Sequence, residues 1–178
     1  YLWKNFRNPK GGNLQVKSDG RRVAVRGNPS HWGRENNHIG VGIDRAKKIY
    51  NEFLQELGLP EFTTGYYGSA QNTRFDVCVN IETGSPEAKR AFLLRQQLQE
   101  KPRMLKSIYG TTTYYAKGGR TRQIRVYDKA EEYGTKKSHN PALLEQAENN
   151  GLVRIEFQIH RPWMHYREMQ EWGDLNSQ

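Results

Sequence analysis

A tyrosine, a lysine and a carboxylate lie close together in the segment IRVYDKAEE, residues 124–132. Tyr127 is a candidate nucleophile, because a phenol with a pKa near about 10 reacts at neutral pH when a nearby cation or base activates it. Lys129 is placed to stabilise a phenolate or the charge that develops on a phosphate. Glu132 follows at a point where the chain can turn back, so that its carboxylate could serve as a metal ligand. These residue types predict transfer of a phosphate group to a tyrosine.

Side-chain alternation along the predicted strands brings two further carboxylates to the same face. The pattern predicts strands over residues 73–81, 124–129 and 152–160. Successive strand residues point to opposite faces, so each strand has one apolar face and one polar face. If the apolar faces join one core, Asp76, Tyr127 and Glu156 emerge together on the other face of the sheet. Two carboxylates on separate strands could then share a divalent cation beside the tyrosine.

The predicted metal ligands are Asp76, Glu132 and Glu156, and carboxylate oxygens favour Mg²⁺ or Mn²⁺. Cys78 is the single cysteine, which excludes an internal disulfide and a zinc site built from cysteines. His160 shares the face of Glu156 by alternation and is an alternative to Glu132 as the third ligand. A solvated sheet face whose charges only pair across strands is the competing interpretation.

The charge of the chain indicates a polyanionic partner. The 178 residues carry a formal net charge of +9 with a pI near 9.7, and basic residues gather at 21–26 and 117–129 with aromatic residues among them. Arginine and aromatic side chains together suit phosphates and unstacked bases. The predicted DNA-binding residues are Lys117, Arg120, Arg122, Arg125 and Arg154.

The element order predicts an α+β fold with a central, largely antiparallel sheet, helices packed on one face and the active site on the opposite face. Hairpins are predicted at 13–26 and 111–129, and helices at 44–58, 85–99, 141–149 and 163–172. The length predicts one domain over 1–178. The chain opens without Met and has no long apolar run, so we expect a fragment of a longer intracellular protein with no membrane span.

Four segments, in this order and spacing, resemble the replication initiators of filamentous phages. They are RGNPSHWGRENNHIGVG, TRFDVCVN, GTTTYYAKGGRTRQIRVYDKAEE and GLVRIEFQIH. More distantly, the chain resembles rolling-circle plasmid Rep proteins of the HUH endonuclease superfamily. The paired histidines that name this superfamily are missing here, since the sequence contains no His-x-His.

The resemblance implies a rolling-circle initiator that nicks one strand at an origin and later rejoins it. The family's Tyr-x-Lys strand falls on Tyr127 and Lys129, its two Arg-x-acid strands on Asp76 and Glu156, and its following acid on Glu132. It also implies single-stranded or hairpin origin DNA as substrate, a host helicase and polymerase as partners, and the bacterial host cytoplasm as location. The sequence does not decide between a monomer and a homodimer.

The sequence leaves three alternatives open for the nucleophile and the activity. Tyr115 and Lys117 repeat the Tyr-x-Lys spacing on the partner strand, although no acid follows them. A non-catalytic basic DNA-binding domain would need the arginines and lysines but not the carboxylates near Tyr127. A metal-dependent nuclease that uses water would leave no covalent link between protein and DNA.

Overall fold

The computed structural model describes residues 2–34, 37, 39–62, 70–99, 106–135, 141–169 and 171. Its backbone contacts divide the chain into two compact units, one formed by residues 1–71 with 169–178 and the other by residues 72–168. The prediction of one domain over 1–178 stays a prediction, and each unit is described separately. None of the described helices is long and apolar enough to cross a membrane.

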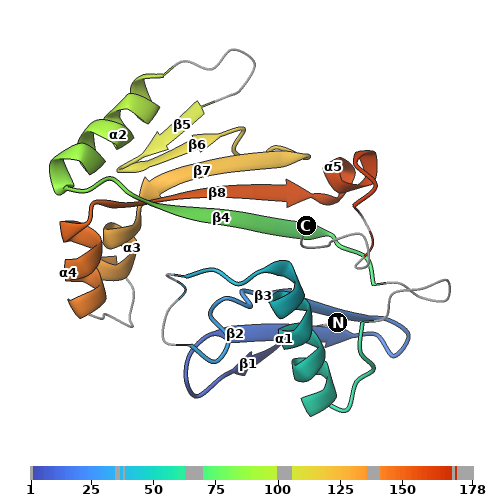
Figure 1. Cartoon of the computed structure of the whole chain (residues 1–178). Helices are drawn as coiled ribbons and strands as arrows, with labels where there is room; N and C mark the ends of the chain where they lie inside the picture. Colours follow the sequence, from blue (N-terminus) through green and yellow to red (C-terminus); the bar gives the residue numbers. More distant parts are fainter. Residues whose placement is uncertain are drawn as a thin grey trace. The chain divides into compact units, whose positions relative to one another are not determined.

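The first unit is a three-stranded antiparallel sheet with one helix. The sheet has the order β1-β2-β3, and its elements are β1 (Lys4–Arg7), β2 (Asn13–Ser18), β3 (Val23–Gly27) and α1 (Ile43–Glu56) (Figure 1). The apolar residues of β2 alternate with polar ones, so Leu14 and Val16 point to one face and pack there against Ile49 and Phe53 of α1. The hairpin predicted at 13–26 is confirmed as β2 and β3.

Helix α1 ends where the sequence predicts. Gly58 has φ +65°, a left-handed conformation that glycine adopts without steric cost. The backbone N–H of Leu59 then bonds to the carbonyl of Leu54 at 2.9 Å, which satisfies one of the last carbonyls of the helix.

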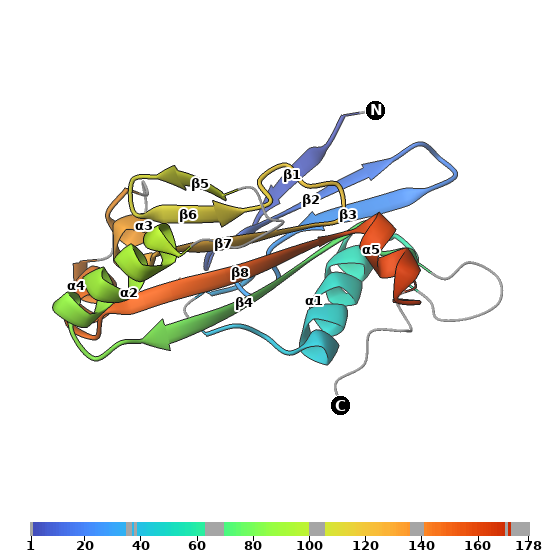
Figure 2. The same ribbon diagram turned by 90° about the horizontal axis from the view of Figure 1, so that it is seen from above.

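The second unit contains a five-stranded sheet in which every neighbouring pair is antiparallel (Figure 2). Its order is β4 (Arg74–Glu82), β8 (Leu152–His160), β7 (Arg122–Asp128), β6 (Thr112–Tyr115) and β5 (Lys106–Tyr109). The three strands that carry the predicted site residues, β4, β8 and β7, are therefore adjacent. This arrangement confirms the α+β prediction and its antiparallel sheet.

Helix α2 (Pro86–Leu98) covers one face of this sheet. Leu93 of α2 packs against Tyr115, Val126 and Val153, which point to the same face of three neighbouring strands. Ser85 caps the helix by accepting a 3.1 Å hydrogen bond from the backbone of Ala88, as the predicted N-cap required. The face with Val126 is thus the core face, and Tyr127 points to the other one.

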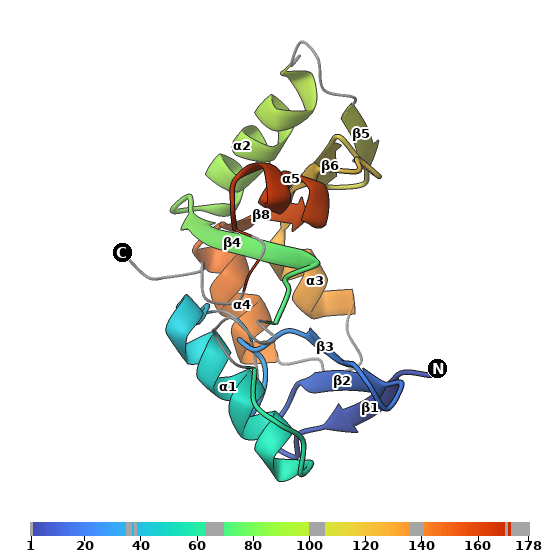
Figure 3. The ribbon, with the colours of Figure 1, turned by 90° about the vertical axis from the view of Figure 1, so that its right-hand side faces the viewer.

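The remaining helices lie at the two ends of the sheet. Helices α3 (Lys129–Thr135) and α4 (Pro141–Asn149) pack side by side, and Ala130 of α3 and Ala147 of α4 form one apolar cluster with Leu152 of β8 (Figure 3). Helix α5 (Arg161–Tyr166) follows β8 directly, two residues earlier than the helix predicted at 163–172. The short strands β1 and β5 were not predicted.

Candidate active site

The phenol of Tyr127 lies between two carboxylates. Its hydroxyl is 2.8 Å from Oε2 of Glu132 and 2.7 Å from Oε1 of Glu156. Glu156 comes from the neighbouring strand β8, whereas Glu132 comes from the first turn of α3, five residues after the tyrosine. The structure therefore brings together three of the residues that the sequence predicted, from three different elements.

This surrounding keeps Tyr127 in its neutral form. Burial raises the pKa of Tyr127 well above its ordinary value, and the negative charges of Glu132 and Glu156 raise it further. The residue is only 7% exposed. The phenol has one proton to donate, yet two carboxylates approach its oxygen, so additional positive charge at this point would lower the pKa and favour the phenolate.

Lys129 reaches the site from a helix and not from a strand. The sequence predicted that the strand continues to residue 129, but β7 ends at Asp128 and α3 begins at Lys129. The cause is the side chain of Asp128, whose Oδ1 accepts a 2.9 Å bond from the backbone of Ala130, as a helix cap does. The Lys129 ammonium is fully buried and lies 2.5 Å from Oε2 of Glu132, one helical turn further on.

Arg125 holds the other carboxylate. It lies directly opposite Glu156 in the β7–β8 register, and its guanidinium donates two hydrogen bonds to Oε2 of Glu156, leaving Oε1 for Tyr127. Burial lowers the pKa of Arg125, but the bond to Glu156 outweighs this effect and the net pKa is raised. The same guanidinium lies 4.8 Å from the centroid of the Tyr127 ring. Arg125, predicted to bind DNA, is therefore also part of this site.

Asp76 lies on the same face of the sheet but binds elsewhere. Its carboxylate pairs with Arg74 at 2.8 and 2.5 Å. In the register of β4 and β8, Asp76 faces Gln158, and Cys78 is the residue opposite Glu156. Among the described residues, no three His, Cys, Asp or Glu side chains are grouped closely enough to hold one metal ion. As a third ligand, Asp76 would first have to leave Arg74.

His160 ends β8 opposite Arg74, at the end of the strand away from α3. Its backbone N–H bonds to the carbonyl of Thr121 at 2.9 Å. Glu132 contacts the phenol directly, so of the two alternatives for the third ligand it is the one that the geometry favours.

Arg154 is the cross-strand neighbour of the tyrosine. It is the residue opposite Tyr127 on β8, is 2% exposed, and donates from Nε to the side chain of Asn80 at 2.7 Å. Its positive charge lowers the pKa of Tyr127, but burial and the charges of Glu132 and Glu156 raise this pKa by more. Arg154 was predicted to bind DNA, and its burial beside Tyr127 means that it is not an open surface contact.

A buried lysine on the other side of the sheet fixes the end of β7. Lys89 of α2 is 3% exposed and lies 2.9 Å from Asp128 and 2.7 Å from Glu148 of α4. Burial opposes its charge, but the hydrogen bonds to Glu148 and Asp128 outweigh burial and raise the pKa of Lys89. This ion cluster joins α2 and α4 to the residue that follows Tyr127. This cluster was not predicted from the sequence, because a helical lysine ordinarily lies in solvent.

The competing tyrosine of the partner strand faces the core. Tyr115 pairs with Ile124 and is 1% exposed, and its hydroxyl donates to the carbonyl of Gln96 in α2 at 2.8 Å. It therefore lies on the opposite face of the sheet from Tyr127. This position favours Tyr127 over Tyr115 as the nucleophile.

The hairpin between β6 and β7 exposes the predicted basic residues. Arg120 and Arg122 are exposed, and within the described part of the chain neither guanidinium has a carboxylate partner. Gly119 is required by the tight turn, since a Cβ there would lie 2.6 Å from the carbonyl oxygen of Arg122. Both arginines are thus free to meet a phosphate.

The first unit has a second cationic surface, on the face of its sheet away from α1. The ring of Trp3 lies 4.1 Å from the guanidinium of Arg26 and 4.9 Å from the ammonium of Lys17. Gln15 accepts a 2.6 Å bond from Nε of Arg26 and lies between the buried Leu14 and Val16 of β2, so it points to the outer face. This cluster includes part of the basic segment 21–26 that the sequence indicated.

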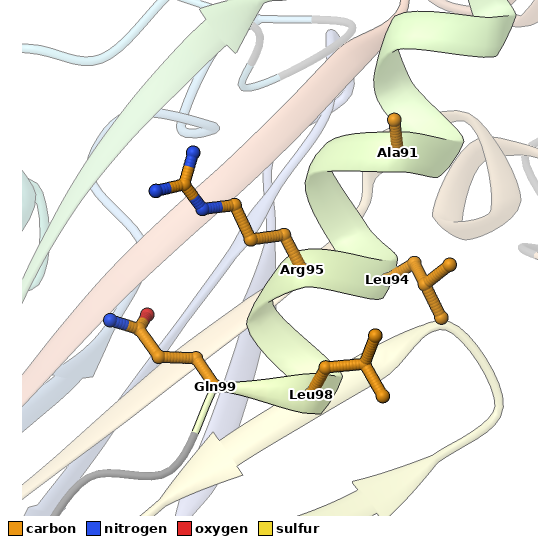
Figure 4. Close-up of a pocket in the computed structure, with 5 residues that line it drawn as sticks. All are labelled: Ala91, Leu94, Arg95, Leu98 and Gln99. Atoms are coloured by element: carbon orange, nitrogen blue, oxygen red, sulfur yellow. The ribbon is translucent and has the colours of Figure 1, made fainter.

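A shallow hollow also runs along the outside of α2. Its lining residues are Ala91, Leu94, Arg95, Leu98 and Gln99 (Figure 4). All five belong to α2 or its C-cap, and α2 covers the sheet face opposite to Tyr127. The hollow is therefore not part of the Tyr127 site.

The fold and the site together define an α+β domain that holds a tyrosine between two carboxylates on the open face of an antiparallel sheet. The chain belongs to the Phage_CRI family, described as the N-terminal part of a phage replication-associated protein, whose model matches residues 6–176. This membership confirms the resemblance to phage replication proteins that the sequence motifs predicted.

The chain is 44% identical over 51 residues to a replication-associated protein of Escherichia phage If1. That match covers 28% of this chain and 16% of the relative, so the chain corresponds to only part of the relative's length. No solved structure matches the chain.

Proposed function

We propose that this chain is the nicking and joining domain of a phage rolling-circle replication initiator. The observation that carries the proposal is the phenol of Tyr127 held by Glu132 and Glu156, with Lys129 against Glu132. Membership of the Phage_CRI family supplies the biological setting, which is phage DNA replication. The substrate is single-stranded or hairpin DNA at the origin, attracted by the net charge of +9.

The chemistry is a transesterification at one phosphate. The oxygen of Tyr127 forms a bond to phosphorus, and the bond from phosphorus to the 3′ oxygen breaks. Glu132 accepts the phenolic proton, and the ammonium of Lys129, 2.5 Å from the same carboxylate oxygen, balances its charge. The leaving 3′ oxygen takes up a proton and becomes the primer for a host polymerase, while the 5′ phosphate stays on the tyrosine. A host helicase unwinds the duplex, and the reverse reaction later rejoins the strand.

The donor set fits a divalent cation such as Mg²⁺ or Mn²⁺. Lys129 balances Glu132 and Arg125 balances Glu156, so Arg154 leaves the site without DNA with one formal positive charge. A phenolate and a phosphate add two negative charges, so one negative charge is in excess, which a divalent cation would offset. Magnesium is typically held by one or two carboxylates together with substrate phosphate oxygens. Glu132 and Glu156 would hold it, with Asp76 as the further ligand expected from the sequence.

Bound there, the cation would polarise the phosphate and lower the pKa of the phenol. The protein's own residues position the reaction. Arg125 orients Glu156 so that one oxygen stays directed at Tyr127, and Arg154 on the neighbouring strand adds positive charge near the phenol. Burial of the phenol excludes water, which would otherwise compete as the nucleophile.

Detection of a covalent protein–DNA adduct would test the proposed function. Incubation with single-stranded origin DNA and Mg²⁺ or Mn²⁺ should give a protein–DNA adduct that survives denaturation and disappears in Tyr127→Phe. Tyr115→Phe is the matched control, because Tyr115 carries the same Tyr-x-Lys spacing but faces α2, so its adduct should persist. An adduct formed by Tyr127→Phe would refute the assignment. Cleavage without any adduct would identify a water-dependent nuclease, and binding without cleavage a non-catalytic DNA-binding domain.

A further inference from the structure

Two tyrosines at the edge of the five-stranded sheet form an exposed aromatic cluster. The rings of Tyr109 and Tyr114 meet edge to face, with centroids 5.7 Å apart and an interplanar angle of 87°. The ammonium of Lys117 lies 3.6 Å from the centroid of Tyr109 and 5.1 Å from that of Tyr114. Tyr109 is 56% exposed on the edge strand β5, so its ring is accessible from solvent.

The cluster lies on the same sheet face as the Tyr127 site. Tyr114 is directly opposite Arg125, and Arg125 is directly opposite Glu156, so the three form one row across β6, β7 and β8. Neighbouring strands are about 4.8 Å apart, which places Tyr114 two strand spacings, or about 10 Å, from Glu156. A DNA strand with one phosphate at Tyr127 would therefore pass the tyrosine pair within a few nucleotides.

A packing role does not account for Tyr109. The tyrosines that serve the core are buried, as Tyr115 is against α2. Tyr109 instead keeps more than half of its surface in water, beside a cation and an aromatic neighbour. An exposed ring next to a lysine is the combination by which single-strand binding proteins hold a base and its phosphate.

We propose that Tyr109 and Tyr114 form a stacking site for one unpaired nucleobase of the DNA strand whose phosphate reacts at Tyr127. Lys117 binds the phosphate next to that base. This inference rests on the proposed function for the position of the DNA, and it adds a feature of the substrate: the base at this point must be out of the double helix. A base inside a duplex has both faces covered by its neighbours, so only a single-stranded segment fits.

The test uses Tyr127→Phe as the background, so that binding is measured without cleavage. Fluorescence anisotropy would give the affinity for a labelled oligodeoxythymidylate and for an abasic deoxyribose-phosphate strand of the same length. Stacking is worth enough per base that Tyr109→Leu should weaken oligodeoxythymidylate binding about tenfold. Tyr109→Phe keeps the ring and should bind within about twofold of the background. On the abasic strand all these proteins should bind equally.

Tyr166→Leu is the matched control. Tyr166 is 78% exposed and has a guanidinium, that of Arg167, 5.6 Å from its ring centroid, but it lies on α5 and outside the row. It should leave binding of both strands unchanged. Because Tyr109 is exposed, its replacement by leucine should also keep the melting temperature of the background protein.

The proposal is overturned if Tyr109→Leu and Tyr109→Phe bind oligodeoxythymidylate alike, or if the loss in Tyr109→Leu is equal on the abasic strand. The outcome is separate from that of the adduct experiment. If no adduct forms but the leucine variant loses base-dependent binding, the nicking function fails and the stacking site stands. If the adduct forms and the leucine variant binds normally, only the stacking site is lost.

Discussion

Glu156 divides its two carboxylate oxygens between Arg125 and Tyr127, although Arg154 is the residue directly opposite the tyrosine in the sheet. The contact between Tyr127 and Glu156, 2.7 Å long, is therefore diagonal across two strands. Arg125 determines this diagonal contact, because it lies directly opposite Glu156 in the sheet and binds its second carboxylate oxygen. The carboxylate is thus directed at the phenol by its neighbour and not by its own strand position.

Neutralising either carboxylate should impair nicking and leave DNA binding largely intact. We expect Glu132→Gln to slow adduct formation by about 10²-fold or more, the usual size of a lost proton acceptor. Glu156→Gln should slow it as well, because Glu156 also contacts the phenol and would hold the cation. Single-turnover cleavage experiments at saturating metal concentration would measure this loss of rate. Glu145→Gln, an exposed position on α4, is the charge-matched control. A wild-type rate in either site variant would remove that residue from the mechanism.

Asp76→Asn addresses the predicted third ligand. If Asp76 leaves Arg74 to bind the cation, the variant should need a higher concentration of Mg²⁺ or Mn²⁺ for half-maximal cleavage, with little change in DNA affinity. Metal titrations of the cleavage rate would show the shift. An unchanged titration would mean that the carboxylate serves only its ion pair of 2.5 Å with Arg74.

The raised pKa of Tyr127 predicts a pH dependence of stability. In the unfolded chain this tyrosine loses its proton near about pH 10, whereas in the folded protein it keeps it to higher pH. Stability from this group is complete below about pH 10 and falls as the pH rises towards the folded-state pKa. Between about pH 8 and 10.5 the free energy of unfolding should fall by about 1 kcal/mol more in the wild type than in Tyr127→Phe.

Urea unfolding at the two pH values would measure this difference. The other tyrosines and the lysines titrate in both proteins and cancel in the comparison. Parallel changes in the wild type and in Tyr127→Phe would show that the phenol is not held in its neutral form.

The buried lysine of α2 should be important for stability. Replacing Lys89 by Met leaves Asp128, which is largely buried, without its partner, so we expect the free energy of unfolding to fall by about 3 kcal/mol. Lys48→Met is the control, because Lys48 forms an exposed pair with Glu52 at 3.8 Å and should change stability by less than about 0.5 kcal/mol. Equal effects in thermal or urea unfolding would contradict the importance of the buried cluster.

The hairpin arginines should act on DNA through charge alone. Replacing Arg120 and Arg122 by Ala should reduce the slope of log affinity against log salt by about 1.4, since each single-strand phosphate contact contributes about 0.7. The variant Arg90→Ala with Arg95→Ala removes the same charge from exposed positions on α2, on the other face of the sheet, and should keep the slope. Equal slopes for the two double variants would refute a specific role of the hairpin.

Local patterns were sufficient to predict most of the second unit. Alternation gave β8 over 152–160, as in the structure, and the Ser85 and Pro86 pair marked the start of α2. Alternation also placed Tyr127 and Glu156 on one face, because their strands are neighbours and the opposite faces share one core. These features follow from the periodicity of apolar side chains and from helix-capping residues, both of which can be recognised directly in the sequence.

Contacts between distant side chains could not be predicted in this way. Asp76 and Glu156 share a face, yet the register places Asp76 opposite Gln158, and register depends on how the strands meet. The burial of Lys89 needs the positions of α2, β7 and α4 together. The helix start at Lys129 was visible in principle, since an aspartate before Lys-Ala-Glu-Glu is a typical N-cap.

The change from strand to helix after Asp128 also limits how this segment can vary between related chains. Glu132 reaches Tyr127 because α3 has completed about one turn by that residue. One inserted residue would rotate the carboxylate by about 100° around the helix axis and away from the phenol. The number of residues between Tyr127 and Glu132 is therefore set by this contact, whereas the β6–β7 turn lies outside the constraint.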